Sequence, residues 1–447
     1  MASSARAVLT AISKPSSGAS SRCGFCRDSK VSSRFGWPCK ISNSARHRIA
    51  ELARAADLPA YVFDLVQLDA HLAEIRATLP AAVQLYYAAK ANAAAPILTT
   101  LARHLDGIEV ASGGELAHVR AVCPGLPIAF GGPGKTEAEL EAALAAGIGV
   151  LHIESVQELR LLAAAAERMD AELDVLLRVN LSIPVGDSAG NGNGNGNGPA
   201  LVMGGVPSPF GLDPDQAELC LPILRSVPRL RLRGVHAHLA SGLTAEEHLA
   251  LSAGVLSWAT HWARRNRVNL SQVTLGGGQS VDYSDPENRF DWRYFGTGLA
   301  DLAQQFPGVQ MRIEPGRALT AYAGWYAAEV LDVRPSHGNW FAVLAGGTHH
   351  LRTPAARGHD QPFAVVPTEQ WTRPWPRPEV TDRPVTLVGA LCTPRDVLAR
   401  QQSVERLRSG DVVAFAMAGA YGWNISHHEF LMHPPPSFHY LGGYLGG

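Results

Sequence analysis

One lysine in this sequence is placed where it could do covalent chemistry. Lys90 follows the alternating, β-forming stretch 83–87 and precedes a helical pattern that starts at Pro96, a residue favoured in the first turn of a helix. The sequence around Lys90 is nearly free of charge, so we expect a desolvated amine with a lowered pKa. Such an amine is a nucleophile that can form a Schiff base with a carbonyl compound. The alternative is a lysine that lies along a strand end with its ammonium in solvent.

Three later segments also carry groups suited to binding or catalysis. The polar candidates are His236, His238, Ser241, Glu314 and Arg317, and the glycines are Gly276, Gly277 and Gly278. Glycines let backbone N–H groups approach a phosphate closely, and a guanidinium can hold a phosphate by a forked contact. Taken singly, each segment has an ordinary alternative: a hydrogen-bonded histidine at a strand edge, a turn, or a surface ion pair.

Regular elements must bring these segments together. Eight strand-like segments alternate with helical patterns: 83–89, 107–111, 127–131, 149–153, 174–180, 233–238, 272–276 and 310–314. This alternation over roughly 250 residues predicts an α/β fold, a (β/α)8 TIM barrel. A doubly wound open sheet is the alternative from the pattern alone. In a barrel the residues just beyond the strand ends face the active site, and the candidates above occupy such positions.

The chain changes character after Arg317. Short segments rich in Val, Trp and Phe recur between prolines and glycines, which predicts a C-terminal β-barrel or sandwich domain, with 60–64 as an early strand of it. We expect an N-terminal extension (1–45), a first strand for the β-domain (46–66), the barrel (67–318, with a flexible Asn-Gly insertion at 181–206) and the β-domain (319–447).

Composition narrows the class of partner and compartment. Lys and Arg number 39 against 40 Asp and Glu, so no basic field points to nucleic acid. No apolar run reaches the roughly 18 residues of a membrane span. The six cysteines form no disulfide framework and no metal site, so a reducing, cytoplasmic location is expected. The extension 1–45 could instead be an organelle transit peptide, a disordered extension or a wrongly assigned start.

Together these segments resemble a known family. Tyr87-Ala88-Ala89-Lys90-Ala91-Asn92 is similar to the cofactor-lysine motif of fold-type III pyridoxal-phosphate-dependent decarboxylases, the ornithine/diaminopimelate decarboxylase family with its alanine racemase-like barrel, and the similarity runs from about 60 to 441. The resemblance implies pyridoxal 5′-phosphate as cofactor and assigns catalytic roles to Lys90, His238, Glu314 and Cys392. It also implies cofactor contacts by Ser241, Gly276, Gly277, Gly278, Gly316, Arg317 and Tyr421, and places Glu109 and Arg178 nearby.

The same resemblance bears on assembly and reaction type. Cys392 matches a cysteine that the family supplies from the second subunit, which implies a homodimer with shared active sites. Glu314 matches the residue at the pyridine nitrogen, where racemases of this fold use arginine, so decarboxylation of a small amino-acid substrate is implied rather than racemisation.

The expected substrate pocket lacks acids. Relatives that bind a distal ammonium use two aspartates, where this chain has Ala345 and Thr393. The cationic candidates around these positions are Arg395, His349, His350 and Arg352, which favours a substrate with an anionic distal group. Segments 130–136, 346–348, 391–394 and 418–423 resemble siderophore-biosynthesis decarboxylases that convert citryl-diaminopropionate to citryl-diaminoethane. The alternative is a decarboxylase of the same fold that acts on diaminopimelate or another amino acid. An amino-acid racemase and a non-catalytic cofactor carrier are less favoured.

Overall fold

The computed structural model describes residues 41–183 and 201–442. Most of the predicted N-terminal extension and most of the Asn-Gly insertion therefore lie outside the described residues. Within them, no helix is both long enough and apolar enough to cross a bilayer.

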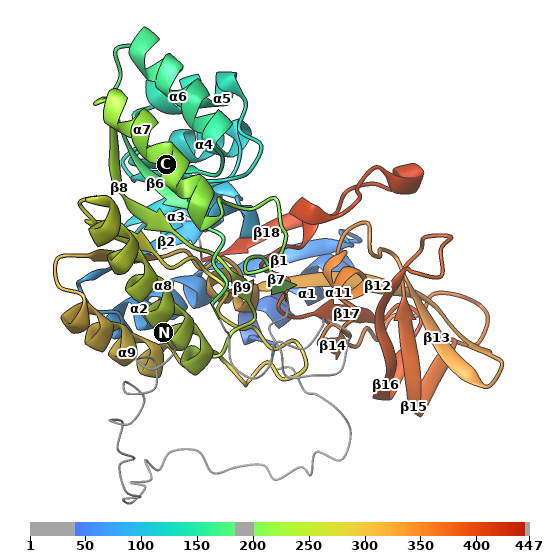
Figure 1. Cartoon of the computed structure of the whole chain (residues 1–447). Helices are drawn as coiled ribbons and strands as arrows, with labels where there is room; N and C mark the ends of the chain where they lie inside the picture. The colour runs from blue at the N-terminus through green and yellow to red at the C-terminus, as the bar shows by residue number, and fades with distance from the viewer. Residues whose placement is uncertain (1–40, 184–200, 443–447) are drawn as a thin grey trace, which may run out of the picture. The chain divides into compact units, whose positions relative to one another are not determined.

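Eight parallel strands close into a barrel in the order β10-β11-β2-β3-β4-β5-β6-β8 (Figure 1). Their bounds are β2 Val83–Ala88, β3 Gly107–Val110, β4 Ile128–Phe130, β5 Val150–Ile153, β6 Leu173–Arg178, β8 Leu230–His236, β10 Gln272–Thr274 and β11 Gln310–Ile313. The barrel closes because β10 pairs with both β8 and β11, while β11 also pairs with β2. The predicted TIM barrel is confirmed, and closure excludes the doubly wound open sheet.

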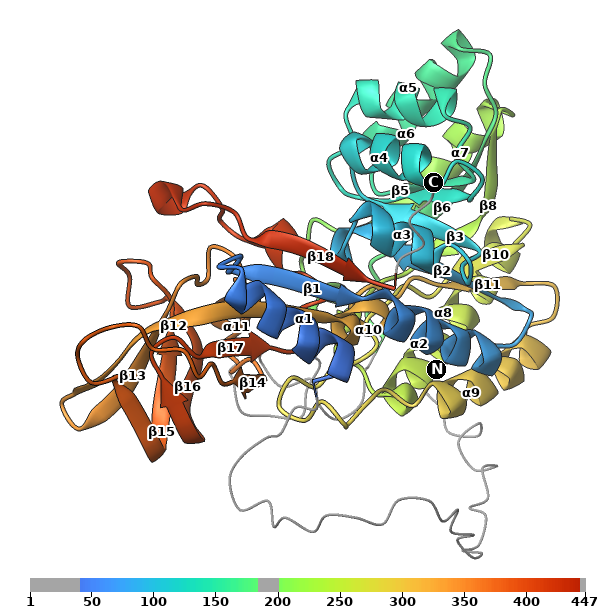
Figure 2. The ribbon, with the colours of Figure 1, turned by 180° about the vertical axis from the view of Figure 1, so that it is seen from behind.

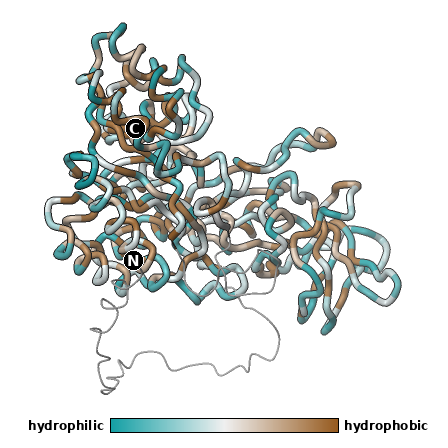
Figure 3. The backbone as a smooth tube through the Cα atoms, viewed as in Figure 1, coloured by the Kyte–Doolittle hydropathy of each residue, from teal (hydrophilic) through white to brown (hydrophobic). Residues whose placement is uncertain are grey.

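Helices follow most barrel strands and bury their apolar faces against them. Helix α2 (Leu65–Thr78) precedes the first barrel strand, and the helices that follow barrel strands are α3 Ala95–Leu101, α4 Gly113–Val122, α5 Glu137–Ala145, α6 Val156–Arg168, α7 Pro214–Ser226, α8 Ala245–Asn266 and α9 Trp292–Gln305. Reciprocal capping boxes start α5 at Thr136 and α8 at Thr244. Hydrophobic segments run through the strands and inner helix faces in Figure 3, whereas hydrophilic ones lie mostly at the outer turns.

A second sheet is built mainly from the C-terminal part of the chain. It contains β1 Ala60–Asp64, β12 Gly324–Ser336, β13 Asn339–Leu344, β14 Phe363–Val366, β15 Glu379–Val388, β16 Val397–Arg408, β17 Val412–Phe415 and β18 Ser437–Leu441. The path β14-β17-β12-β13-β15-β16 forms most of this sheet. β1 lies between β12, which it meets antiparallel, and β18, which runs parallel to it (Figure 2).

Two elements were not predicted. Helix α1 (Asn43–Arg54) starts before the expected boundary at 45 and buries Ala45, Ile49 and Leu52, which share one face at intervals of four and three residues. Strand β16 is polar along much of its length, so it lacks the apolar signal by which its neighbours were recognised. Short elements complete the fold: β7 Leu201–Val202 pairs with β9 Ala240–Ser241, and α10 (Arg317–Thr320) and α11 (Thr353–Arg357) follow strands β11 and β13.

Candidate active site

Lys90 lies in the 3-10 turn η1 (Ala89–Ala91) directly after β2. Its Nζ donates a 2.9 Å hydrogen bond to Oε2 of Glu109, which stands at the end of the neighbouring strand β3 in register with Ala88. Desolvation opposes the charged amine, but the carboxylates of Glu109 and Glu314 outweigh it and raise the pKa of Lys90 above its ordinary value. The expected lowered pKa is therefore wrong, because it considered only sequence neighbours and the adjacent strand supplies the acid.

The segment 419–424 holds the lysine turn from the side of the second sheet. Asn424 donates to the backbone carbonyl of Lys90 at 2.7 Å, and the backbone N–H of Tyr421 donates to the carbonyl of Ala91 at 2.8 Å. Asn92 in turn donates to the carbonyl of Gly419 at 3.0 Å. These three bonds fix the lysine backbone independently of its side-chain ion pair.

The glycine run after β10 packs where side chains cannot. A Cβ on Gly276 would lie 2.7 Å from Nδ1 of His238, and one on Gly277 would lie 2.4 Å from the carbonyl oxygen of Glu314. Gly278, with φ +99°, lies against Ala240 and Ser241. The backbone N–H of Gly277 donates to Nδ1 of His238 at 3.3 Å. The run thus brings the ends of β8, β10 and β11 together at contacts that only glycine permits.

Glu314 directly follows β11 in a buried, polar part of the barrel. Its Oε2 accepts from Nε2 of His236 at 3.1 Å, while its buried Oε1 has no hydrogen-bond partner within the described residues. The imidazole rings of His236 and His152 stack with centroids 4.2 Å apart. Burial lowers the pKa of both histidines well below the ordinary value, so both are neutral.

Arg317 opens the short helix α10, beyond Glu314. Its Nη1 donates to the hydroxyl of Tyr283 at 2.8 Å, and its guanidinium lies 4.4 Å from the ring centre of Tyr421. A Cβ on Gly316 would meet the Tyr421 hydroxyl at 3.4 Å. An arginine held by two aromatic side chains, with no carboxylate within ion-pair distance in the described chain, can bind an anion without first breaking a salt bridge.

Comparison with known proteins decides the family. The family described as "Pyridoxal-dependent decarboxylase, pyridoxal binding domain" matches residues 65–321, more than half of the chain. The chain belongs to this family. It is a pyridoxal-phosphate-dependent decarboxylase, and the predicted enzyme class and cofactor are confirmed.

Named relatives cover most of the decarboxylase. It is 38% identical over 384 residues to the 2-[(L-alanin-3-ylcarbamoyl)methyl]-2-hydroxybutanedioate decarboxylase of Staphylococcus aureus, covering 85% of this chain and 93% of that protein. It is 31% identical over 405 residues to the L-glutamyl-[BtrI acyl-carrier protein] decarboxylase of Niallia circulans, covering 88% and 91%. The structure of Helicobacter pylori diaminopimelate decarboxylase with L-lysine aligns with a TM-score of 0.72 at 23% identity, covering 85% and 91%, and supports the fold.

The residues present fit the family's cofactor. The free Oε1 of Glu314 is a buried acceptor without a donor, as a protonated pyridine nitrogen requires. The glycine run, in which the N–H of Gly277 is bonded to His238, lets the backbone come close to a phosphate, and Arg317 offers that phosphate a cation. Lys90 offers the amine for covalent attachment. Bound pyridoxal phosphate would supply an electron sink for the carbanion left by loss of CO2.

The remaining predicted site residues lie on other loops. Cys392 is exposed in the turn between β15 and β16, and no hydrogen bond joins it to the Lys90 group in the part of the chain that is described. Arg395 and Arg352 are exposed, and neither guanidinium is within ion-pair distance of a carboxylate among the described residues. Asp396, which Arg395 might have paired with, is buried and accepts from the backbone N–H groups of Thr348 and Leu391.

The expected charge of two histidines is wrong. Burial lowers the pKa of His349 to about 4 and that of His350 to about 3, so both are neutral near pH 7. Both nitrogens of His350 already have partners, the hydroxyl of Tyr326 at 2.9 Å and the carbonyl of Pro434 at 3.0 Å. Of the four predicted cations, only Arg395 and Arg352 carry positive charge near pH 7. The two histidines were counted as cations because their burial cannot be seen in the sequence.

Sequence reasoning assigned no role to His236, which it offered only as a candidate, and it did not point to His152 or Tyr283. His236 had a signal, since it precedes His238 by two residues and strand residues at that spacing share a face. His152 and Tyr283 had none, because only closure of the barrel brings His152 to Glu314 and only the loop after β10 brings Tyr283 to Arg317.

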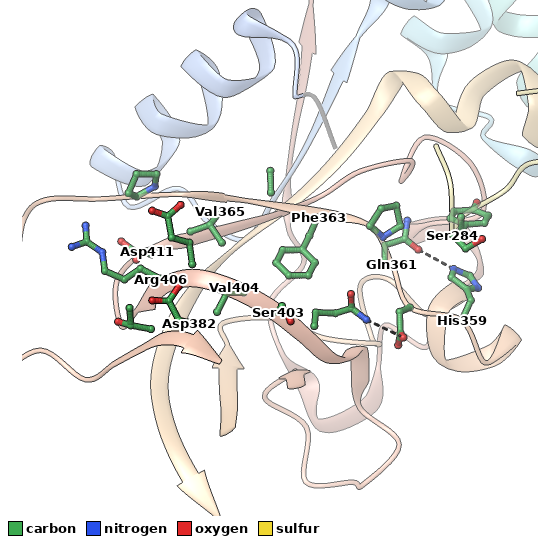
Figure 4. A pocket seen from close by; sticks show the side chains of 18 of the residues that line it. Ser284, His359, Gln361, Phe363, Val365, Asp382, Ser403, Val404, Arg406 and Asp411 are labelled. Atoms are coloured by element: carbon green, nitrogen blue, oxygen red, sulfur yellow. Dashed lines mark hydrogen bonds between the residues drawn. The ribbon is translucent and has the colours of Figure 1, made fainter. Parts of the chain in front are cut away.

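A separate hollow of about 1010 Å³ lies beside β14 and β16. Figure 4 shows Phe363 and Val365 on one wall and Ser403 and Val404 on the other. Neither Lys90 nor Glu314 lines it, so it is not the catalytic site. Tyr283 lines it and also holds Arg317.

Proposed function

We propose that this enzyme removes the α-carboxylate of an amino acid whose far end carries carboxylates, and that the substrate is citryl-diaminopropionate. The product would be citryl-diaminoethane, in siderophore biosynthesis. The named substrate of the S. aureus relative is such a compound, since a hydroxybutanedioate with two carboxylates is joined through an amide to the side chain of alanine.

The observation that carries the proposal is the absence of a free acid in the loops expected to meet the substrate. Ala345 and Thr393 replace the expected aspartates, and the nearby acid Asp396 is buried with both oxygens bonded to backbone N–H groups. A distal ammonium would find no available carboxylate in these two loops. Lysine and ornithine are therefore disfavoured as substrates.

Positive charge is available in the same loops. The turn that carries Arg395 packs against residues 346–348. The backbone N–H of Ala390 donates to the carbonyl of Gly346 at 2.8 Å, and the backbone N–H of Thr348 donates to Oδ1 of Asp396 at 2.7 Å. Arg352 follows that segment, and its charge adds to burial in lowering the pKa of the nearby His427. Two unpaired guanidiniums suit the two distal carboxylates of a citryl group.

The chain's own residues divide the remaining work. Lys90 provides the covalent attachment, and Glu109 holds its ammonium before attachment. Glu314 would accept a hydrogen bond from the protonated pyridine nitrogen and so keep the ring protonated. His238, whose pKa is held well below its ordinary value by burial, would pack against the ring. The cofactor phosphate would be held by Ser241, the glycines 276–278, Gly316, Arg317 and Tyr421. After CO2 leaves, Cys392 delivers the proton that replaces it on the α-carbon.

We further propose a homodimer with shared sites. Cys392 is exposed in a loop that makes no hydrogen bond to the lysine group of its own chain within the described residues, yet the proton it would deliver is needed beside Lys90. A two-fold dimer lets each copy supply its cysteine to the other copy's lysine.

Removal of one guanidinium tests the substrate assignment. A lost charged hydrogen bond costs about 1.5–3 kcal/mol, so Arg395→Ala should lower kcat/KM for citryl-diaminopropionate roughly ten- to a hundredfold. Cofactor affinity should change little. Arg400→Ala is the matched control, because Arg400 is also exposed, on the adjoining strand β16, but is paired with Asp360. Equal, small effects of both changes would contradict the role of Arg395.

A further inference from the structure

We propose that His236 is a positioning residue for the cofactor: as a hydrogen-bond donor supported by His152, it fixes one carboxylate oxygen of Glu314 and leaves the other for the ring nitrogen of pyridoxal phosphate. This inference rests on the proposed role of Glu314. It concerns how the barrel, rather than the substrate pocket, prepares the site.

The geometry gives the two carboxylate oxygens of Glu314 different surroundings. Nε2 of His236 lies 3.1 Å from Oε2 of Glu314, and since a carboxylate can only accept, the proton is on Nε2. Nδ1 of His236 is buried without a partner, consistent with that tautomer. Oε1 of Glu314 is 3.8 Å from Nε2 of His152, too far for a hydrogen bond, and is left free. One oxygen is thus held and one is open.

The histidines orient Glu314 without competing for it. Their side chains are at most 5% exposed, and burial together with the nearby cations keeps them neutral. A protonated His236 would form an ion pair with Glu314 and weaken its attraction for a pyridinium. A neutral donor avoids this, so the full negative charge of Glu314 remains for the ring.

The stack explains why two histidines are present. The rings of His152 and His236 lie 4.2 Å apart at 26°, so His152 restricts rotation of the His236 ring away from Glu314. His152 stands on β5 and His236 on β8, on either side of β6, which pairs with both strands. Three parallel strands therefore set the angle at which the carboxylate is held.

A metal site is the competing interpretation of this group. His152, His236 and Glu314 place three potential ligand atoms within 4.8 Å of one another. However, the guanidinium of Arg312 and the ammonium of Lys135 are close enough to lower the pKa of both histidines. A divalent metal ion would add two positive charges beside these cations with only the Glu314 carboxylate to offset them, whereas a pyridinium adds one, which a single carboxylate can balance.

Equilibrium binding of two cofactors to the cofactor-free enzyme tests the inference, with tryptophan fluorescence as readout. One is pyridoxal phosphate, and the other is its 1-deaza analogue, in which carbon replaces the ring nitrogen. The variants are His236→Leu, which removes the donor, and His236→Gln, whose amide can donate from a similar position. By the cost of a charged hydrogen bond, His236→Leu should weaken pyridoxal phosphate about tenfold and the analogue less than about twofold. His236→Gln should restore most of the loss.

Controls separate the possible failures. Leu176→Ala makes a cavity in the barrel at the residue in register with His152, and should weaken both cofactors alike. If Glu314→Gln also fails to distinguish the two cofactors, the assignment of Glu314 itself is wrong. If Glu314→Gln distinguishes them and His236→Leu does not, the positioning role of His236 is overturned. Should His236→Leu fail to fold, His236→Asn, whose shorter amide cannot reach Glu314, replaces it.

Discussion

Asn424 donates a 2.7 Å hydrogen bond to the backbone carbonyl of Lys90, a residue 334 positions earlier in the chain. The bond joins the loop after β17 to the turn after β2. Because the adjoining residues Tyr421 and Asn92 add two more bonds across the same contact, the lysine that carries the chemistry is positioned by both sheets of the molecule.

We predict that Asn424→Ala loosens the lysine turn without removing any side chain of the active site. A hydrogen bond of this kind contributes about 0.5–1.5 kcal/mol, so cofactor affinity should fall roughly two- to tenfold. Asn266→Ala, which removes another bond from an asparagine amide to a backbone carbonyl, at the end of α8, is the control and should leave affinity unchanged. Titration of cofactor-free protein measures both, and an unchanged affinity for Asn424→Ala would argue against positioning.

Few lysines of this chain could bind the cofactor covalently. The whole chain has five lysines, and the described residues contain only Lys90 and Lys135. The side chain of Lys135 is 1% exposed and lies 3.0 Å from Glu158. Borohydride reduction followed by peptide mass spectrometry should therefore place the cofactor on Lys90 alone. An adduct on Lys135 or in the first 40 residues would contradict the assignment.

Shared sites predict complementation between two inactive variants. When Lys90→Ala and Cys392→Ala proteins are mixed equally and allowed to exchange, half of the dimers are hybrids, each with one intact site, so about a quarter of native activity should return. Mass measurement verifies the hybrid. A verified hybrid with no more activity than its parents would show that each site is built from one chain.

The neutral histidines make a prediction about pH. Had His349 and His350 the ordinary pKa near 6.5, their attraction for a substrate carboxylate would be lost as pH rises through that value. With pKa values of about 4 and about 3, that loss is complete before neutral conditions are reached. KM for the citryl substrate should therefore stay constant between roughly pH 5.5 and 8. A KM that rises between about pH 6 and 7, and flattens in His349→Gln, would restore the histidines to the pocket.

The comparison of sequence with structure separates local from non-local information. The eight barrel strands were predictable because each has its own pattern of apolar residues, as 83–88 and 310–313 show. The pKa of Lys90 was not, because its acid, Glu109, comes from the next strand. Similarly, His349 and His350 were predicted to be cations because their burial is not visible in the sequence. Nothing in the sequence predicts that His152 lies next to Glu314. Patterns predict elements, whereas electrostatics depends on which elements become neighbours.

Recognition of distal carboxylates by the loops that carry Arg395 and Arg352 should decide which substrate is used. CO2 release can be measured under identical conditions from citryl-diaminopropionate, meso-diaminopimelate, ornithine and lysine. We predict the highest kcat/KM for citryl-diaminopropionate, with ornithine and lysine lower by at least the roughly ten- to a hundredfold that one charged contact provides. If ornithine or lysine proves the better substrate, the pocket binds an ammonium group and the substrate assignment is wrong.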